Sequence, residues 1–430
     1  MKLEISSLSN GLTIITDPMA GLESAALGVW IGTGSRNETP AQMGISHMLE
    51  HMAFKGTATR SARQIAEEIE AVGGYLNAYT SREQTTFHAR VLKADVALGL
   101  ELIADILTAP TYDQAELERE RQVVLQELGQ ARDTPDDIIF DHLQSVIYRG
   151  QALGWSILGE AATVSAFQPA DLRDYAGARY RAPAITLVSS GAVSHDQIVA
   201  LAAEKFAALG SGAPQPTEPA RYVSGDMRLE EDLEQAHVVY AFPGISARDP
   251  DFYTAQLYTM ILGGGMSSRL FQEVREKRGL CYSIYSFAGN FLDGGFTGIY
   301  VGTSEKDAGE VSAVIAGEME AMTGTITDAE LSRARAQLKS GLLMGLERPG
   351  TRAESIAGQI FALGRVQPVA EIVERLDAIE PDAVRRFAAF TMRAPSIAAL
   401  GPIGRLESHA TFAGRFMPRD NTAEKMHAAE

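Results

Sequence analysis

The chain has 430 residues, 45% of them hydrophobic and 22% charged, which predicts a globular protein of two domains of about 200 residues each. Its formal net charge of −17 argues against nucleic acid or an anionic membrane as the main partner, whereas a basic peptide would be attracted. No apolar run reaches the ~18 residues of a membrane span. The one cysteine, Cys281, excludes an internal disulfide, and its apolar surroundings favour a buried structural thiol over a nucleophile.

The first half of the chain alternates between strand-like and helix-like segments. Ser61 is a typical N-cap for a helix that Gly73 and Gly74 end. The elements expected in chain order are strands at 12–16 and 25–31, helices at 43–54 and 61–72, strands at 75–79 and 84–91, helices at 94–107, 113–130 and 135–148, a strand at 184–189 and a helix at 195–208.

The expected helix at 43–54 carries the order His-x-x-Glu-His at His47, Glu50 and His51. Positions i, i+3 and i+4 share one helix face, so the three side chains point to a common spot. Two neutral imidazoles there can bind zinc, beside a carboxylate able to act on water. Composition alone would produce such a pattern about 0.01 times in a chain like this. The sequence therefore predicts a zinc centre for amide hydrolysis.

A Gly- and Pro-rich stretch at 210–219 predicts a linker, and the segments after it repeat the order of those before it. Residues 65–76, a helix, a glycine stop and a strand, correspond to 270–281, and region 251–260 contains no histidine. Further elements are expected as a strand at 237–242 and helices at 306–322 and 328–347.

This repeat predicts two duplicated domains. We expect a zinc-binding catalytic domain at 1–209, a linker at 210–226, a homologous domain without zinc ligands at 227–417 and a mobile tail at 418–430. Because strands come in adjacent pairs, we expect an α+β fold in which each domain is an antiparallel-rich sheet covered by helices on one side.

Catalytic zinc usually takes a third protein ligand. Glu120 and Glu127 lie two turns apart on the expected helix at 113–130 and share a face. One of them could bind the metal while the other orients a ligating histidine, and spacing alone does not choose between them. Charged residues interpreted as solvated are Glu116, Glu118, Lys55 and Arg278.

Five segments carry a family resemblance, at residues 47–57, 76–83, 120–128, 153–159 and 268–282. They resemble the pitrilysin-like inverzincin metallopeptidases, and in particular the half-length branch with the catalytic beta subunit of the mitochondrial processing peptidase and its bacterial relatives. The likeness runs from about residue 12 to residue 401. It implies one zinc ion (Zn2+) per chain, held by His47, His51 and Glu127, with Glu120 as a supporting carboxylate and Glu50 as general base.

The resemblance also implies residues that handle substrate. Asn77 and Ala78, on the strand to which family members add an extended substrate, and Phe54 are carried over as substrate contacts. Arg275 and Tyr282 match an Arg-x6-Tyr pair that binds the substrate carbonyl and supports the oxyanion.

Single-chain members of the family are about twice this length and enclose a chamber with four domains. We therefore expect a homodimer with composite active sites, in which the zinc half of one chain faces the Arg/Tyr half of its partner. The expected function is a zinc metalloendopeptidase that cleaves unfolded peptides in a closed dimeric chamber. It is expected in the cytoplasm, because residues 1–7 lack the features of a targeting signal.

Two other readings remain open. The chain could be a non-catalytic partner or scaffold subunit, as some relatives that have lost ligand residues are. It could also hydrolyse a small non-peptide substrate, since a metal site alone does not exclude one.

Overall fold

A computed structural model of the chain describes residues 3–213 and 215–417. These residues form two compact units. Unit 1 comprises the described residues within Met1–Thr134, Gly150–Ala220 and Gln337–Glu374, and unit 2 comprises those within Pro135–Arg149, Arg221–Ala336 and Arg375–Glu430. No helix of the described residues is long and apolar enough to cross a membrane.

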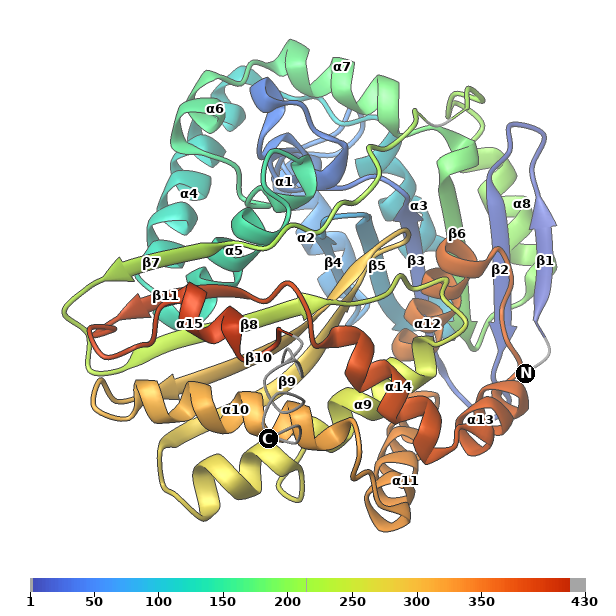
Figure 1. Ribbon diagram of the computed structural model, residues 1–430. Helices are drawn as coiled ribbons and strands as arrows, with labels where there is room; N and C mark the ends of the chain where they lie inside the picture. Colours follow the sequence, from blue (N-terminus) through green and yellow to red (C-terminus); the bar gives the residue numbers. More distant parts are fainter. Residues whose placement is uncertain (1–2, 214, 418–430) are drawn as a thin grey trace, which may run out of the picture. The chain divides into compact units, whose positions relative to one another are not determined.

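Unit 1 is built on a six-stranded sheet in the order β1-β2-β6-β3-β5-β4 (Figure 1). The pair β2–β6 is parallel, and all other pairs are antiparallel. Strand β4 is an edge strand, paired with β5 alone. The strands are β1 (Glu4–Ser7), β2 (Thr13–Pro18), β3 (Ser24–Ile31), β4 (Tyr75–Thr80), β5 (Thr85–Leu92) and β6 (Ile185–Gly191).

The main core of unit 1 lies between one face of this sheet and helices α1, α3 and α8. It takes alternate residues of β3, such as Leu27 and Val29, because successive side chains of a strand point to opposite faces. The helices of this unit are α1 (Ile45–Ala53), α2 (Ala62–Ala71), α3 (Val96–Thr108), α4 (Gln114–Arg132), α6 (Ala161–Ala166), α7 (Pro169–Arg179), α8 (His195–Lys205) and α12 (Pro349–Leu363), with 3-10 turns at Ser35–Asn37, Pro40–Gln42, Lys93–Asp95, Ala152–Gly154 and Ala182–Ala184.

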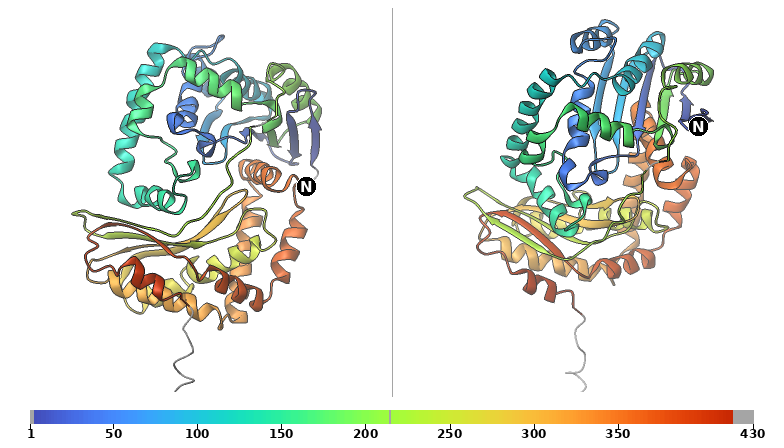
Figure 2. Two further views of the ribbon diagram at one scale, coloured as in Figure 1. Left: turned by 45° about the horizontal axis from the view of Figure 1, so that its top comes forward. Right: turned by 90° about the horizontal axis from the view of Figure 1, so that it is seen from above.

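Helix α12 comes from the second half of the chain but packs on the opposite face of the unit 1 sheet, against β3 and β6 (Figures 1 and 2, orange against blue and green strands). The Arg352 guanidinium donates to both oxygens of the buried Asp17 carboxylate on β2, at 2.5 and 2.8 Å. A second apolar cluster lies beneath the helix and contains Ile15, Trp30, Val188, Ala353, Ile356 and Ala357.

Unit 2 has a five-stranded sheet in the order β7-β11-β8-β10-β9, in which β7–β11 is the parallel pair. The strands are β7 (Asp226–Glu230), β8 (Ala236–Pro243), β9 (Cys281–Asn290), β10 (Gly295–Thr303) and β11 (Ser396–Gly401). The helices are α5 (Pro135–Ile147), α9 (Phe252–Gly263), α10 (Ala308–Met322), α14 (Pro381–Thr391) and α15 (His409–Gly414), with a π-helical turn η6 at Phe271–Glu276; α11 (Asp328–Gly345) and α13 (Val369–Ala378) cross from one unit to the other.

Helix α5 comes from the first half of the chain and packs on β8 and β11 of unit 2. Its Phe140 ring stacks on Tyr300 and meets Phe287 edge to face. The two halves therefore exchange one helix each. The linear division expected from the sequence lacks this exchange, because periodicity says which face of a helix is buried but not which sheet buries it.

The α+β class and the two similar domains expected from the sequence are confirmed, with one addition. Each sheet receives the exchanged helix as well as the helices of its own half, so cover is not confined to one side. The expected tail at 418–430 lies outside the described residues.

Candidate metal centre

Helix α1 begins at a backbone position that suits glycine. Gly44 has φ +90°, and a Cβ there would lie 2.7 Å from the Leu158 carbonyl oxygen. Gly44 has no side chain to cap the helix, and the buried Glu38 carboxylate does so instead, accepting the N–H groups of Gly44 and Ser46 at 2.9 Å each. Met48, Leu49 and Met52 are buried in the core, which turns the opposite helix face toward α4.

That opposite face of α1 carries the two predicted histidine ligands, and Glu127 comes from α4. His47 Nε2 and His51 Nε2 lie 3.6 and 3.5 Å from the same Glu127 oxygen, Oε2, and one ligand atom from each residue falls within 4.8 Å of the others. Ligands bonded at 2.0–2.1 Å to a tetrahedral zinc ion are roughly 3.4 Å apart. The three side chains therefore fit a zinc ion without rearrangement of the backbone.

Helix α4 presents both of its candidate carboxylates to α1, in different roles. Glu127 faces the Nε2 atoms of both histidines, whereas Glu120 Oε2 lies 3.0 Å from His51 Nδ1 on the far side of that ring. This arrangement suits Glu127 as the ligand and Glu120 as the group that orients His51, the choice that helical spacing alone left open. The Asp113 side chain caps the helix at the amides of Ala115 and Glu116.

Burial shapes the protonation of the site. It lowers the pKa of His47 to about 4, with a smaller effect from the neighbouring His51, and so favours the neutral imidazole that binds metal. Burial also raises the pKa of Glu50, helped by the Glu127 charge and opposed by the hydrogen bond from Thr80 and by His51. A glutamate with a raised pKa is better matched to proton transfer near neutral pH.

Thr80 is a site residue that the sequence analysis missed. It ends the edge strand β4, and its hydroxyl lies 2.6 Å from Glu50 Oε2 as donor. Strand alternation held a signal for it, because Ala78 is buried toward the helices and Thr80, two residues on, must face the same way.

The interpretation of Lys55 as a solvated charge is wrong. Its side chain is 30% exposed, and Nζ lies 2.7 Å from Glu120 Oε1, the oxygen that His51 does not use. Lys55 follows His51 by four residues but lies two residues past the end of α1 at Ala53, so helical spacing by itself does not bring the two side chains together. The burial of the glutamate between them could not be seen in the sequence.

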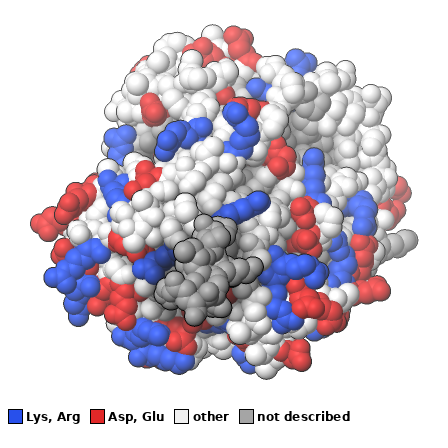
Figure 3. Space-filling view, in the orientation of Figure 1, with Lys and Arg blue, Asp and Glu red and all other residues white. Residues whose placement is uncertain are grey.

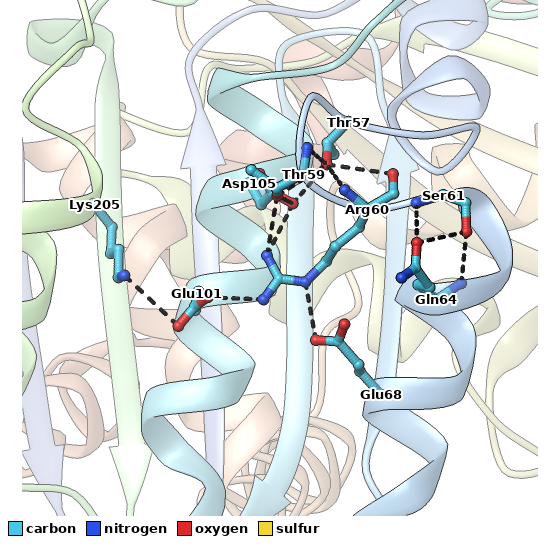
Figure 4. Close-up of polar contacts among 9 residues, drawn as sticks. All are labelled: Thr57, Thr59, Arg60, Ser61, Gln64, Glu68, Glu101, Asp105 and Lys205. Carbon is cyan, nitrogen blue, oxygen red and sulfur yellow. Dashed lines mark hydrogen bonds and ion pairs between the residues drawn. The ribbon is translucent and has the colours of Figure 1, made fainter.

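The segment after α1 is tied down by Arg60, whose guanidinium contacts three carboxylates (Figure 4). It reaches Glu68 on α2 at 2.9 Å and Glu101 and Asp105 on α3 at 2.7 and 3.0 Å. The hydroxyl of Thr57 also donates to Asp105, at 2.7 Å. These contacts fix the residues that lead out of α1.

The predicted substrate contacts lie on or near the free edge of the sheet. The Ala78 N–H donates to its neighbour's Asn77 Oδ1 at 2.9 Å, so this amide is turned away from the ladder with β5 and toward the edge. The Asn77 side chain is exposed. Phe54, by contrast, is half-buried at the end of α1, with its ring 6.4 Å from that of Phe87, and packs partly against the core.

Arg275 and Tyr282 belong to unit 2 and lie together there. The Arg275 guanidinium sits over the rings of Phe271 and Tyr282, at 4.7 and 4.9 Å from their centroids. Tyr282 is 75% exposed. Cys281 next to Tyr282 is half-buried, and burial raises the pKa of its thiol to about 11, which agrees with an unreactive role.

Comparison with known proteins finds two matching family models and several relatives. Residues 14–161 match the model of insulinase (peptidase family M16), and residues 166–338 match that of the peptidase M16 inactive domain. An uncharacterized zinc protease of Rickettsia felis is 39% identical over 379 residues, which cover 88% of this chain and 92% of that protein. A probable mitochondrial-processing peptidase subunit beta of Arabidopsis thaliana is 35% identical over 428 residues, covering 96% and 80% of the two chains.

A solved structure of a protease from Helicobacter pylori has the same fold. It superposes with a TM-score of 0.87 at 21% identity, over 93% of this chain and 99% of that one. The two matching family models and these curated relatives show that the chain belongs to peptidase family M16, whose members similar to this chain include proteins named as zinc proteases and as processing-peptidase beta subunits.

Proposed function

We propose that the chain is a zinc-dependent endopeptidase. The observation that carries this proposal is the convergence of His47, His51 and Glu127 on one point beside the half-buried carboxylate of Glu50. Membership of a metallopeptidase family and relatives named as zinc proteases support it. One zinc ion per chain satisfies the ligand set.

A zinc ion held there would acidify water and polarise a scissile carbonyl. Glu50 is the base: Thr80 engages its Oε2, which leaves Oε1 to take a proton from the attacking water and pass it to the leaving amine nitrogen. Burial of Glu50 strengthens its interaction with both partners, because competing bulk water is excluded.

Substrates are proposed to be unfolded peptides that bind in extended form. Strand β4 lies at the edge of its sheet, and its outward-facing Ala78 N–H would exchange the hydrogen bond to Asn77 Oδ1 for one to a peptide strand added by main-chain pairing. The net charge of −17 favours basic peptides through long-range attraction. On the face drawn in Figure 3 the acidic side chains of the described residues are interspersed with basic ones, so this attraction is diffuse there.

The Arg/Tyr pair is proposed to complete the site from a second copy of the chain, in a homodimer that encloses the substrate in a chamber. This part rests on the family resemblance and on the presence of both residue sets in one chain. The exposed Tyr282 hydroxyl and the Arg275 guanidinium are donors suited to a developing oxyanion.

Zinc analysis and cleavage of a quenched fluorescent peptide test the proposal. Glu50→Gln should keep one zinc ion per chain and lose ~10²-fold or more in kcat. The matched control Glu116→Gln, which alters the pair of a half-buried glutamate with the exposed Arg119, should keep both the zinc ion and the rate. If the wild type binds zinc but cleaves no unfolded peptide, the result would instead favour the alternative that the chain is a non-catalytic partner subunit. Capture of cellular peptides on Glu50→Gln would then identify the substrate.

A further inference from the structure

The two histidines of the metal centre differ in what holds their outer ring nitrogen. His51 Nδ1 lies 3.0 Å from Glu120 Oε2. His47 Nδ1 is buried and has no hydrogen-bond partner among the described residues. Glu120 is therefore the carboxylate that orients a ligand here, and whatever fixes Glu120 acts on the metal centre.

Glu120 is itself held at both oxygens. Its side chain is 8% exposed, and a carboxylate that deeply buried is costly unless it is paired. Oε2 faces His51, and Oε1 faces the Lys55 ammonium at 2.7 Å. The carboxylate cannot turn without breaking one of these contacts.

The backbone that presents Lys55 is fixed on both sides. Its own N–H donates to the Met52 carbonyl at the end of α1. Gly56, which follows with φ +117°, accepts the N–H and the hydroxyl of Thr111 at 3.0 and 3.1 Å. Beyond it lie the Arg60 contacts of Figure 4. The Lys55 ammonium therefore projects from a segment whose backbone is fixed on both sides.

Charge balance is a second argument for a role of Lys55 at the metal centre. Glu50, Glu120 and Glu127 bring three carboxylates to one partly buried centre, and a zinc ion supplies two positive charges. The Lys55 ammonium supplies the remaining one. Removing it would leave an uncompensated negative charge at the site, which is unfavourable at low dielectric.

We propose that Lys55 is a positioning residue of the metal centre. Its ammonium holds the Glu120 carboxylate in the orientation that accepts a hydrogen bond from His51 Nδ1–H. The lone pair of His51 Nε2 then faces the other ligands. The inference rests on the proposed zinc site and goes beyond it, since it assigns a role to a residue outside the ligand set.

The test is zinc affinity, measured by competition with a chromophoric chelator at a temperature where every variant is folded. Lys55→Met keeps the length of the side chain and removes its charge, and Lys55→Arg restores the charge. Lys277→Met is the control: this lysine also pairs with a glutamate, Glu273, but belongs to unit 2. Cobalt-substituted samples report ligand geometry through their visible spectrum.

Lys55→Met should raise the Kd for zinc by about 10-fold or more and shift the cobalt spectrum, while Lys55→Arg stays within about threefold of wild type and Lys277→Met is unchanged. In a Glu120→Gln background Lys55→Met should have little further effect, because nothing is left to orient. Unchanged zinc affinity in Lys55→Met, or losses that simply add in the double variant, would overturn the proposal. Failure of the wild type to cleave peptides would refute the peptidase and leave this result standing.

Discussion

The hydroxyl of Thr80 donates to Glu50 Oε2 across 2.6 Å, and so joins the last residue of the edge strand to the proposed general base. The same hydroxyl lies 3.5 Å from the Ser46 carbonyl oxygen, but its single proton serves the carboxylate far better at the shorter distance. This hydrogen bond therefore connects β4, the strand proposed to bind substrate, directly to the proposed catalytic base.

Thr80→Val should lower kcat while zinc content stays the same. Valine keeps the shape of threonine and removes only the donor, and a hydrogen bond to a charged group is worth about 1.5–3 kcal/mol, or ~10-fold to ~100-fold in rate. Steady-state kinetics on a fluorogenic peptide measure the effect, and Thr80→Ser should restore most of the rate. A Thr80→Val enzyme with normal kcat would show that Glu50 needs no such support.

Zinc should stabilise unit 1 against unfolding. A ligand that binds only the folded state at 100 times its Kd adds about 2.7 kcal/mol. Both tryptophans of the chain, Trp30 and Trp155, belong to unit 1, so their fluorescence in urea follows this unit. His47→Ala should abolish the gain. A zinc effect of equal size in His47→Ala would place the stabilising ion elsewhere.

The Arg60 contacts should matter more for stability than an ordinary surface pair. Arg60 is 14% exposed and bonds to Glu68, Glu101 and Asp105, whereas Arg63 is 86% exposed and pairs with Glu67 alone. Arg60→Met should cost about 2–3 kcal/mol, because it strips a half-buried Asp105 of its cation, and Arg63→Met at most about 0.5 kcal/mol. Urea titrations followed by tryptophan fluorescence compare the two directly, and equal losses would contradict a structural role for the Arg60 contacts.

What the sequence revealed depended on how local each feature is. The His-x-x-Glu-His helix and the strand pair β4–β5 follow from short-range periodicity, and the structure has both where they were expected. Strands β1 and β7, with four and five residues, were missed because such short edge strands carry little pattern.

Features that depend on how elements cross were out of reach of periodicity and spacing, and the roles of Glu120 and Glu127 were assigned in advance only through the family resemblance. Seven residues separate Glu120 from Glu127 on one helix face, and only the packing of α4 against α1 decides that Glu127 meets Nε2 while Glu120 meets Nδ1. The exchange of α5 and α12 is of the same kind, since it depends on the free face of a sheet formed by distant segments.

Glu38 should make stability depend on pH. Burial raises the pKa of this carboxyl to about 7, against the opposing hydrogen bonds from the amides of Ser46 and Gly44. The folded state then holds a proton that the unfolded chain releases near pH 4.5, so this contribution is fully present below about 4.5 and is lost as pH rises through about 7. Relative to Glu38→Gln, the wild type should lose on the order of 3 kcal/mol across that window.

Urea titrations of the two proteins at a series of pH values measure the difference. All other titrating groups are shared, so the difference between the curves isolates Glu38. Parallel stability curves for wild type and Glu38→Gln would mean that the hydrogen bonds from the amides at the start of α1 cancel the effect of burial on the pKa of Glu38.

Mixed dimers decide whether the active site is shared between chains. A His47→Ala chain should lack zinc and an Arg275→Ala chain should lack the oxyanion donor, so each alone is inactive. In a heterodimer purified through two different tags, a trans arrangement unites the intact zinc site of one chain with the intact Arg/Tyr pair of the other. One of two sites is then complete, and about half of the wild-type activity should return, because twofold symmetry makes the two sites equivalent.

The matched control pairs His47→Ala with Glu50→Gln. Both changes fall on the zinc half, so no arrangement of the two chains builds a complete trans site, and the mixture should stay inactive. If Arg275 instead served the zinc ion of its own chain, the His47→Ala and Arg275→Ala heterodimer would contain one site without zinc and one without the arginine, and would be as inactive as its parents. Restored activity in that heterodimer alone therefore requires the arginine to act across the dimer.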